Sequence, residues 1–290
     1  MAEIPQPNLR IAFQGEYGAF SEAAAIQLLG ENITTVPRAT FDSAFQAIAE
    51  GAADALLAPV ENSLAGSVVR VYDLLLESKL DIVAETILPI EMHLIGSPGA
   101  TIEGLRSVAS HPMALAQCER FFLQHPGLRR IPAEDTAGSV RDALAAGDKS
   151  AAGIAARRAA VRYGGVILAE AIQDNKENFT RFVLLVPRDS AIQNDSLRPQ
   201  LTTAVQKLSL ALRLAHRPGA LLAALRPFAD HGINLLKIES RPIHGRPWEY
   251  QFFLDVQTEE PAKLHEALHE VKVAASFFRV LGRYSPARVS

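Results

Sequence analysis

The feature that most constrains the fold of this chain is a change in the order of its strand and helix patterns near residue 190. Before it, short apolar runs alternate with segments of helical spacing, which predicts an α/β layer with largely parallel strands. After it, the order becomes strand–helix–strand–strand–helix–strand. The polar, turn-rich residues 187–203 separate the two patterns and predict a linker. Because 290 residues is near the length at which a single core stops growing, we expect two domains.

Capping and breaking residues set the expected helix ends in the first region. Gly30 ends one helix, the pair His111-Pro112 opens another, and Asp135-Thr136 caps a third. The predicted strands are residues 10–13, 53–60, 107–110, 129–132, 151–155 and 182–186. The predicted helices are residues 21–29, 43–50, a helix that begins at 111–112, 136–146 and 156–163.

The second region has the βαββαβ order of a ferredoxin-like sandwich of about eighty residues. Its predicted strands are residues 207–215, 233–240, 250–257 and 277–284, and its predicted helices are residues 218–230 and 261–275. The predicted organisation is therefore an α/β domain over residues 8–188, a linker over 189–203 and a second domain over 204–285.

Composition excludes several classes of function. One cysteine excludes an internal disulfide and any multi-cysteine metal site, and we expect no metal site. The 29 basic and 32 acidic residues supply no dense basic face, so nucleic-acid binding is not expected. The N-terminus has no targeting pattern, and no run of apolar residues is long enough to span a membrane. We therefore expect a cytoplasmic protein.

Polar residues gather where the predicted strands become helices. In open α/β sheets, ligands bind at the carboxyl ends of strands, where helix N-termini offer free N–H groups to anions. Several such loops at one cleft would suit a small, multiply charged acid, although a single Ser, Thr or Asp there is most often only a helix cap. The loops are residues 14–18 (QGEYG), 61–67 (ENSLAGS), 110–111 (SH) and 134–136 (EDT).

The glycine loop does not indicate a nucleotide. Gly15 and Gly18 follow a strand, but the remaining glycines of the dinucleotide pattern are missing, and no phosphate-loop lysine follows. No cofactor is therefore expected. Cys118 is flanked by apolar residues, which favours a buried thiol over a nucleophile.

Residues 178–182 (NFTRF) enter an apolar strand. Alternation along a strand places Thr180 and Arg181 on opposite faces. A threonine in a strand is usually a good β-former, and an arginine there is usually an exposed charge. The pattern alone therefore leaves a structural role and a functional role open.

Read together, these loops resemble prephenate dehydratase over nearly the whole chain. In the second region, Gly219-Ala220-Leu221 and Glu239-Ser240-Arg241-Pro242 resemble the phenylalanine-binding motifs of the ACT regulatory domain of that family. The motifs of the first region are residues 13–21 (FQGEYGAFS), 59–66 (PVENSLAG), 110–118 (SHPMALAQC), 135–137 (DTA) and 178–182 (NFTRF).

The resemblance implies two α/β lobes, like those of type II periplasmic binding proteins, with the active site in the cleft between them. The implied reaction removes carbon dioxide and hydroxide from prephenate to give phenylpyruvate, on the route to phenylalanine, without a cofactor. Thr180 would be the catalytic hydroxyl, and Arg181 would hold a substrate carboxylate or brace the cleft. The implied substrate-binding residues are Asn62, Ser63, Ser110, Gln117, Glu134, Thr136 and Phe182.

The resemblance also implies feedback inhibition by phenylalanine at the ACT domain. ACT domains of this kind pair with one another, so a homodimer or homotetramer is expected. The implied effector-binding residues are Gly219, Ala220, Leu221, Asn234, Glu239, Ser240, Arg241 and Pro242.

Two alternatives stay open at this point. Residues 62–76 and 135–138 also resemble arogenate dehydratases, which carry out the same elimination on the amino-acid analogue of prephenate. Met113 stands where the family usually has glutamine, and Ala156 replaces a common serine. A non-catalytic sensor, built from a binding-protein-like cleft and an amino-acid-binding domain, is the alternative from another class.

Overall fold

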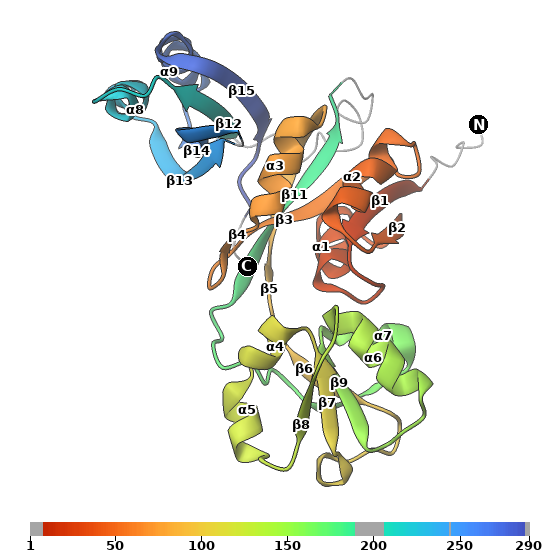
Figure 1. Ribbon diagram of the computed structural model, residues 1–290. Helices are drawn as coiled ribbons and strands as arrows, with labels where there is room; N and C mark the ends of the chain where they lie inside the picture. The colour runs from red at the N-terminus through yellow and green to blue at the C-terminus, as the bar shows by residue number, and fades with distance from the viewer. Residues whose placement is uncertain (1–7, 189–205, 244, 288–290) are drawn as a thin grey trace, which may run out of the picture. The chain divides into compact units, whose positions relative to one another are not determined.

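The computed structural model describes residues 8–188, 206–243 and 245–287 (Figure 1). The chain divides into two compact units, unit 1 (Met1–Leu74 and Thr86–Val183) and unit 2 (Leu75–Glu85 and Leu184–Ser290). Two strands, β5 (Leu80–Pro89) and β11 (Phe179–Pro187), contribute residues to both. The predicted linker, residues 189–203, lies outside the described residues, as do the first seven residues.

The first lobe of unit 1 is built on a parallel sheet. Strand β1 lies between β2 and β3 and runs parallel to both, β11 lies beyond β3, and the short β4 pairs antiparallel with β3. Ile11, Ala12 and Phe13 of β1 are all fully buried, which explains why this strand is a continuous apolar run. The elements are β1 (Leu9–Gln14), α1 (Phe20–Leu29), β2 (Ile33–Arg38), α2 (Phe41–Ala49), β3 (Ala55–Asn62), β4 (Gly66–Ser67) and α3 (Val69–Glu77).

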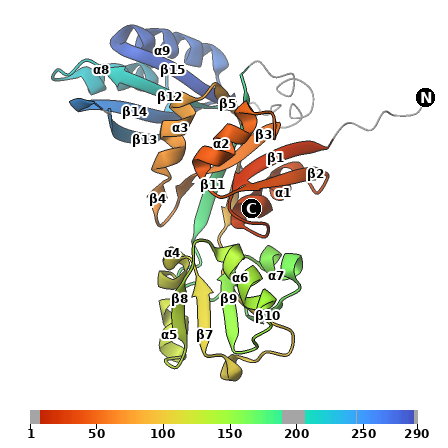
Figure 2. The same cartoon turned by 45° about the vertical axis from the view of Figure 1, so that its right-hand side comes forward.

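The second lobe of unit 1 is a sheet with helices on both faces (Figure 2). Strand β7 pairs in parallel with β8 and β9, whereas β6 is antiparallel to β9 and to β10. In β6, Leu94 packs toward α4 and α5, and its neighbour Ile95 packs toward α6 and α7. The elements are β6 (His93–Gly96), β7 (Ser107–Ser110), α4 (Pro112–Ala116), α5 (Glu119–Gln124), β8 (Arg129–Pro132), α6 (Thr136–Ala145), β9 (Ala151–Ala155), α7 (Arg157–Tyr163) and β10 (Val166–Ala169).

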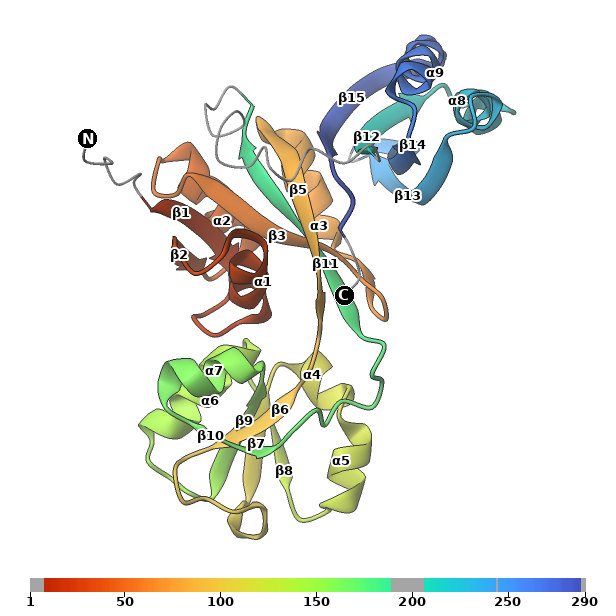
Figure 3. The same cartoon turned by 180° about the vertical axis from the view of Figure 1, so that it is seen from behind.

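Unit 2 has the predicted βαββαβ order. The strands lie in the order β13-β14-β12-β15 with antiparallel pairing, and α8 and α9 pack on one face over a core that includes Leu210, Phe228 and Leu264 (Figure 3). Strand β15 also pairs with β5, where a Cβ at Gly282 would overlap the carbonyl oxygen of Ile82. The elements are β12 (Gln206–Leu214), α8 (Ala220–Asp230), β13 (Asn234–Ile243), β14 (Arg246–Thr258), α9 (Pro261–Ala274) and β15 (Ala275–Tyr284).

The predicted α/β class, the two lobes and the ferredoxin-like order are confirmed. The sequence patterns did not predict β2, β5, β6 and β10. Strands β2 and β5 carry polar residues and a proline, and β6 and β10 are only four residues long, too short to show a clear alternation. The helix that begins at Pro112 ends at Ala116, and a second helix begins at Glu119. Among the described residues, no helix is both long and apolar enough to cross a membrane.

Candidate active site in unit 1

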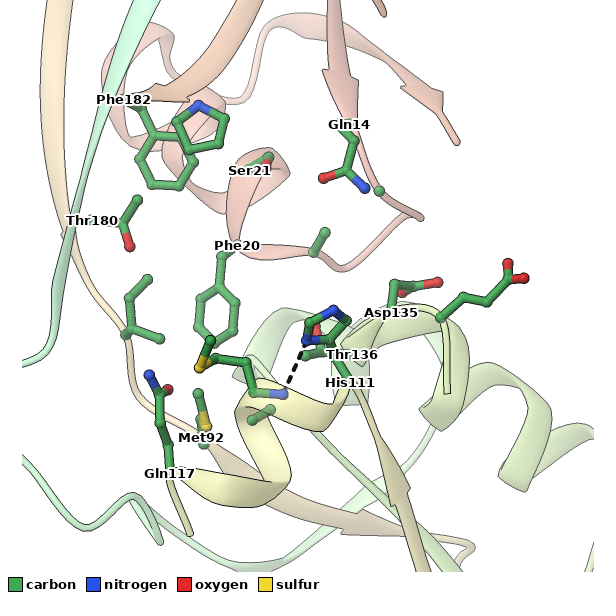
Figure 4. Close-up of a pocket in the computed structure, with 17 residues that line it drawn as sticks. Gln14, Phe20, Ser21, Met92, His111, Gln117, Asp135, Thr136, Thr180 and Phe182 are labelled. Carbon is green, nitrogen blue, oxygen red and sulfur yellow. Dashed lines mark hydrogen bonds between the residues drawn. The ribbon is translucent and has the colours of Figure 1, made fainter. Parts of the chain in front are cut away.

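A pocket of about 300 Å³ opens between the two lobes of unit 1 (Figure 4). Three of the four predicted loops reach it, namely residues 14–18, 110–111 and 134–136, and strand β11 contributes Thr180 and Phe182. Its lining residues are Gln14, Gly15, Ala19, Phe20, Ser21, Pro59, Ile90, Met92, His111, Met113, Ala114, Gln117, Glu134, Asp135, Thr136, Thr180 and Phe182. Polar and apolar side chains therefore line the pocket in nearly equal numbers.

Thr180 is nearly buried at the pocket wall, with 8% of the residue exposed. Its Oγ1 accepts a hydrogen bond of 2.9 Å from Nδ2 of Asn62. In the part of the chain that the structure describes, the Thr180 hydroxyl donates no hydrogen bond, so its proton is available to a molecule in the pocket. Phe182, two positions along the strand, lines the same wall and is 2% exposed.

Arg181 points to the other face of β11, as the alternation of a strand predicts. Its Nη2 lies 3.3 Å from Oε2 of Glu61 and 3.4 Å from the hydroxyl of Tyr72. It is not among the residues that line the pocket. Because Glu61 directly precedes Asn62, this ion pair braces the end of β3 that carries Asn62.

Asn62 and Ser63 join the end of β3 to the start of β11. Asn62 Nδ2 also donates to Oδ1 of Asn178 at 2.8 Å, and its Oδ1 accepts from the backbone of the following turn. The Ser63 hydroxyl donates to the carbonyl of Glu177 and accepts from the N–H of Phe179, both at 2.9 Å. Neither side chain lines the pocket, although both were predicted to bind substrate.

Ser110 and Gln117 lie near the two ends of the motif at residues 110–118 and differ in environment. Ser110 is fully buried, and its hydroxyl donates to the carbonyl of Ile154 at 2.7 Å, which joins β7 to β9. Gln117 follows α4 and lines the pocket, and its Oε1 accepts a hydrogen bond of 3.2 Å from Nδ2 of Asn178. Of the two, only Gln117 presents a polar group to the pocket.

Helix α6 begins at the pocket, with Thr136 at its first position. The Asp135 carboxylate caps this helix, as predicted, by accepting the N–H of Gly138 at 2.6 Å. Glu134 and Thr136 flank the cap and line the pocket. Since the cap already uses Asp135, Thr136 supplies a neutral hydroxyl and Glu134 a carboxylate to this side of the pocket.

His111 also lines the pocket. Its Nδ1 accepts a hydrogen bond of 3.2 Å from the N–H of Met113 at the start of α4 (Figure 4). A backbone N–H can only donate, so the ring proton is on Nε2, which makes this nitrogen a donor. The sequence had placed this histidine in a loop and a motif, but not among the substrate-binding residues.

The N-terminus of α1 is a site that sequence reasoning described only in general terms. Ala19, at the N-cap, has no polar side chain, so the first N–H groups of the helix are without a side-chain cap. Ala19, Phe20 and Ser21 line the pocket. Of the three helices that begin at the pocket, α4 and α6 are capped by His111 and Asp135, so α1 is the one whose positive end is open to an anion.

The loop before α1 packs closely against the second lobe. A Cβ on Gly18, whose φ is +88°, would lie 2.7 Å from Cα of Ala159 in α7. The buried Glu22 accepts the N–H of Gly18 at 2.7 Å and pairs with Arg158 of α7 at 3.1 Å. These contacts hold the two lobes together around the pocket, which explains the glycine at position 18.

Cys118 lies in the core of the second lobe, as predicted. It is fully buried, and its Sγ lies 3.7 Å from Sδ of Met92. Burial, with a smaller effect from Asp174, raises the pKa of the thiol to about 12. Within the described residues, no group of three or more His, Cys, Asp or Glu side chains is arranged to hold a metal.

In unit 2, the two ACT motifs border the same part of β14. Gly219 is the N-cap of α8 with φ of +78°, and Ala220 and Leu221 line a small cavity with Tyr250 and Phe252 of β14. In β13, Ser240 pairs opposite Phe252 and Pro242 opposite Tyr250, while Glu239 and Arg241 alternate with them. Asn234 begins β13 at the far end of the strand.

Comparisons with known proteins agree with these features. The model of the prephenate dehydratase family matches residues 11–190, and that of the ACT domain matches residues 209–282. The relative named arogenate dehydratase/prephenate dehydratase 1, chloroplastic, from Arabidopsis thaliana is 40% identical, covering 96% of this chain and 72% of the relative.

Two solved structures share the fold along nearly the whole chain. Prephenate dehydratase from Arthrobacter aurescens in complex with L-Phe has a TM-score of 0.83 at 30% identity, covering 96% of this chain and 90% of that one. GqqA, described as a novel type of quorum quenching acylase, has a TM-score of 0.85 at 33% identity, covering 96% and 98%. Because the family model spans more than half of its length, the chain belongs to the prephenate dehydratase family, whose named activity is that of a carbon–oxygen lyase, and it carries an ACT domain.

Proposed function

We propose that the pocket of unit 1 converts prephenate to phenylpyruvate and that the Thr180 hydroxyl assists departure of the ring hydroxyl group. The observation that carries this proposal is the Thr180 hydroxyl at the pocket wall, whose oxygen accepts from Asn62 and whose proton is free for the substrate. In the reaction, the bond to the ring carboxylate breaks and carbon dioxide leaves. The electron pair enters the ring and displaces the hydroxyl group, which takes up a proton and departs as water.

Thr180 acts in this proposal as a hydrogen-bond donor and relay, because a free threonine hydroxyl is a weak acid. A donor aimed at the oxygen on which negative charge develops is worth more in a pocket that excludes water than in solution. The Asn62 amide fixes the acceptor side of Oγ1, so the hydroxyl proton turns toward the substrate. Water replaces the proton that the relay delivers, and aromatisation drives the loss of carbon dioxide.

Neutral donors hold the acid groups of the substrate in this proposal. Among the lining residues there is no lysine or arginine, so the carboxylates are assigned to the open N-terminus of α1, the Gln117 amide and the Thr136 hydroxyl. Phe20 and Phe182 supply apolar contacts to the ring. We assign Arg181 to bracing, together with Glu61, and not to substrate contact.

Arogenate is the alternative substrate, and the relative from Arabidopsis thaliana carries both activities in its name. The carboxylate of Glu134 at the pocket would suit the ammonium group that distinguishes arogenate from prephenate. Incubating the pure protein with each compound separates the two, since prephenate gives phenylpyruvate and arogenate gives phenylalanine. Formation of neither product would contradict the proposed function, and equal rates would contradict a preference for one substrate.

We further propose that unit 2 binds phenylalanine and inhibits unit 1. The solved structure from Arthrobacter aurescens contains L-Phe, which supports an amino-acid effector for this ACT domain. Gly219 at the open start of α8 would offer backbone N–H groups to its carboxylate, and the Glu239–Pro242 motif would complete the site. Phenylalanine should then lower activity and raise the melting temperature, and an absence of both effects would refute the assignment.

We also propose that the protein is a cytoplasmic homodimer or homotetramer assembled through its ACT domains. Strand β13 is at the edge of its sheet, and Leu236 and Ile238 on it are more than two-fifths exposed. An edge of this kind is a pairing surface for a second copy. Light scattering with size-exclusion chromatography tests this, and a monomer at working concentration would contradict it.

A further inference from the structure

We infer that Asn178, a residue outside the pocket wall, is a positioning residue that makes Gln117 a hydrogen-bond donor to the substrate. The inference rests on the proposed function and adds a determinant of substrate binding to it. Asn178 is 1% exposed and lies two positions before Thr180. Its side chain joins Asn62, which holds Thr180, to Gln117 on the second lobe.

Backbone N–H groups fix the orientation of the first amide in this series, that of Asn62. Oδ1 of Asn62 accepts the N–H groups of Leu64 at 3.0 Å and Ala65 at 2.8 Å. A backbone N–H can only donate, so the oxygen of the Asn62 amide must face these two groups. The Asn62 nitrogen therefore faces β11, where it donates to both Asn178 and Thr180.

Each later amide takes its direction from the one before it. Because Oδ1 of Asn178 accepts from Asn62 at 2.8 Å, its Nδ2 is the group that faces Gln117. This Nδ2 donates to Oε1 of Gln117 at 3.2 Å. In the part of the chain that the structure describes, Nε2 of Gln117 makes no hydrogen bond, and the residue lines the pocket.

The hydrogen bonds of these three amides therefore leave two donors facing the pocket. They are the hydroxyl of Thr180 and the Nε2 amide of Gln117, and an anionic substrate requires donors. Asparagine suits position 178 because its fork presents one acceptor and one donor at the same time. The backbone carbonyl of Asn178 also accepts from the N–H of Ile90 at 2.7 Å, which fixes the residue beside the pocket.

The variant Asn178→Asp has nearly the shape of the wild-type side chain but reverses the direction of the hydrogen bond between residue 178 and Gln117. An ionised carboxylate still accepts from Asn62, but it cannot donate to Gln117. The Gln117 amide then turns, gives its nitrogen to Asp and presents Oε1 to the substrate anion. A hydrogen bond lost to a charged group predicts a rise in KM of at least about tenfold at pH 8, with a smaller fall in kcat.

Protonation should reverse this loss, because a carboxylic acid again has a donor for Oε1 of Gln117. Burial raises the pKa of a carboxyl group, so recovery should occur as the pH falls from 8. The charged side chains on the segments that carry the amides are Glu61 with Arg181, Asp174, which caps the start of α5, Lys176 and Glu177. The ratio of variant to wild-type kcat/KM at each pH removes their shared contribution and that of His111.

The matched control is Asn175→Asp, an equal change of charge three residues away. Asn175 is exposed and accepts the N–H of Glu177, which aspartate can also do, so activity should stay within about twofold of wild type at every pH. An Asn178→Asp protein that matches wild type, or that is impaired equally at every pH, would overturn the inference.

A second variant keeps the test usable if Asn178→Asp does not fold. In Gln117→Glu, the carboxylate accepts from Asn178 and leaves an acceptor facing the pocket, so KM should rise at pH 8 and recover in acid. An unchanged KM, or a loss independent of pH, would also overturn the inference. Failure of the wild-type protein to convert either substrate would instead contradict the proposed function.

Discussion

The two units each contain a buried polar cluster, and the two clusters differ in charge and in closure. In unit 1, the amides of Asn62, Asn178 and Gln117 form a neutral chain that ends at the pocket. In unit 2, the Lys207 ammonium lies 2.9 Å from Oε2 of Glu85, with side-chain exposures of 8% and 2%. Beside it, the Ser209 hydroxyl contacts Asp255 at 2.5 Å and Tyr284 at 2.6 Å.

The difference indicates what each cluster does. The ion pair of unit 2 is satisfied within the protein, since Glu85 also accepts the N–H of Ala287 at 2.9 Å. Such a pair ties β12 to β5 across the intervening strand β15 and leaves no group for a ligand. The amide chain of unit 1 ends in donors that have no partner in the described protein. We therefore expect changes in the amide chain to affect catalysis and changes in the ion pair to affect stability.

The largest effect should come from Thr180→Ala. Loss of the hydroxyl removes the proposed donor to the departing oxygen, so kcat should fall by at least about a hundredfold. The melting temperature should change little, because β11 keeps its apolar neighbours. Steady-state assays with prephenate and a thermal melt measure the two effects.

Thr180→Ser is the matched control, because it keeps the hydroxyl and loses one methyl group. It should retain much more activity than Thr180→Ala. If Thr180→Ala kept kcat within about threefold of wild type, the proposed role of this residue would be wrong.

Lys207→Met should show the opposite balance. Removing the lysine leaves the Glu85 carboxylate buried without its cation, and breaking a buried pair in this way costs about 3 kcal/mol of unfolding free energy. Chemical denaturation measures the loss, and kcat/KM of the folded fraction should stay within a few fold.

The double variant Glu85→Leu with Lys207→Met tests the cause. Two apolar side chains in place of the pair should recover part of the lost stability, since no charge is then left buried. A double variant less stable than Lys207→Met would show that the pair is not the reason for the loss.

Ser110→Ala should have a smaller effect, and on stability alone. The hydroxyl already donates to the carbonyl of Ile154. Its removal should therefore lower the free energy of unfolding by about 1 kcal/mol and leave kcat/KM unchanged within about twofold. Denaturation and steady-state assays on the same preparation separate these outcomes. A tenfold fall in kcat/KM with a normal melt would return Ser110 to the substrate-binding residues that the sequence suggested.

Ser110 and Arg181 show which features of the site the sequence can predict and which it cannot. Strand alternation placed Thr180 and Arg181 on opposite faces, because a period of two holds wherever the strand is regular. The same sequence did not indicate that the Ser110 hydroxyl turns to Ile154, because that choice depends on β9, about 40 residues away in the chain. Local pattern thus located the loops, whereas the direction of each side chain required the neighbouring elements.

His111 and the start of α1 were missed for a related reason. A histidine before a proline indicates the start of a helix and nothing more. Only the structure shows that His111 Nδ1 accepts a hydrogen bond from the N–H of Met113, which assigns the ring proton to Nε2. Nothing in the sequence indicated Ala19, because this residue matters by lacking a capping side chain, which leaves the first N–H groups of α1 open. The sequence pattern also could not predict that residues 75–85 belong to unit 2, since this segment lies far from the ACT region in the chain.

The smallest effect concerns Cys118, a buried group that belongs to neither polar cluster. Burial raises the pKa of its thiol to about 12, so at pH 8 the thiolate, which is the reactive form, is about one part in ten thousand. Iodoacetamide should therefore modify the native protein far more slowly than the urea-unfolded protein, and mass spectrometry can follow both. Because the residue packs on Met92 behind the pocket, saturating substrate should leave its slow rate unchanged. Rapid alkylation of the native protein would mean that the core of the second lobe opens readily, and the rigid amide chain anchored on that lobe at Gln117 would then lose its support.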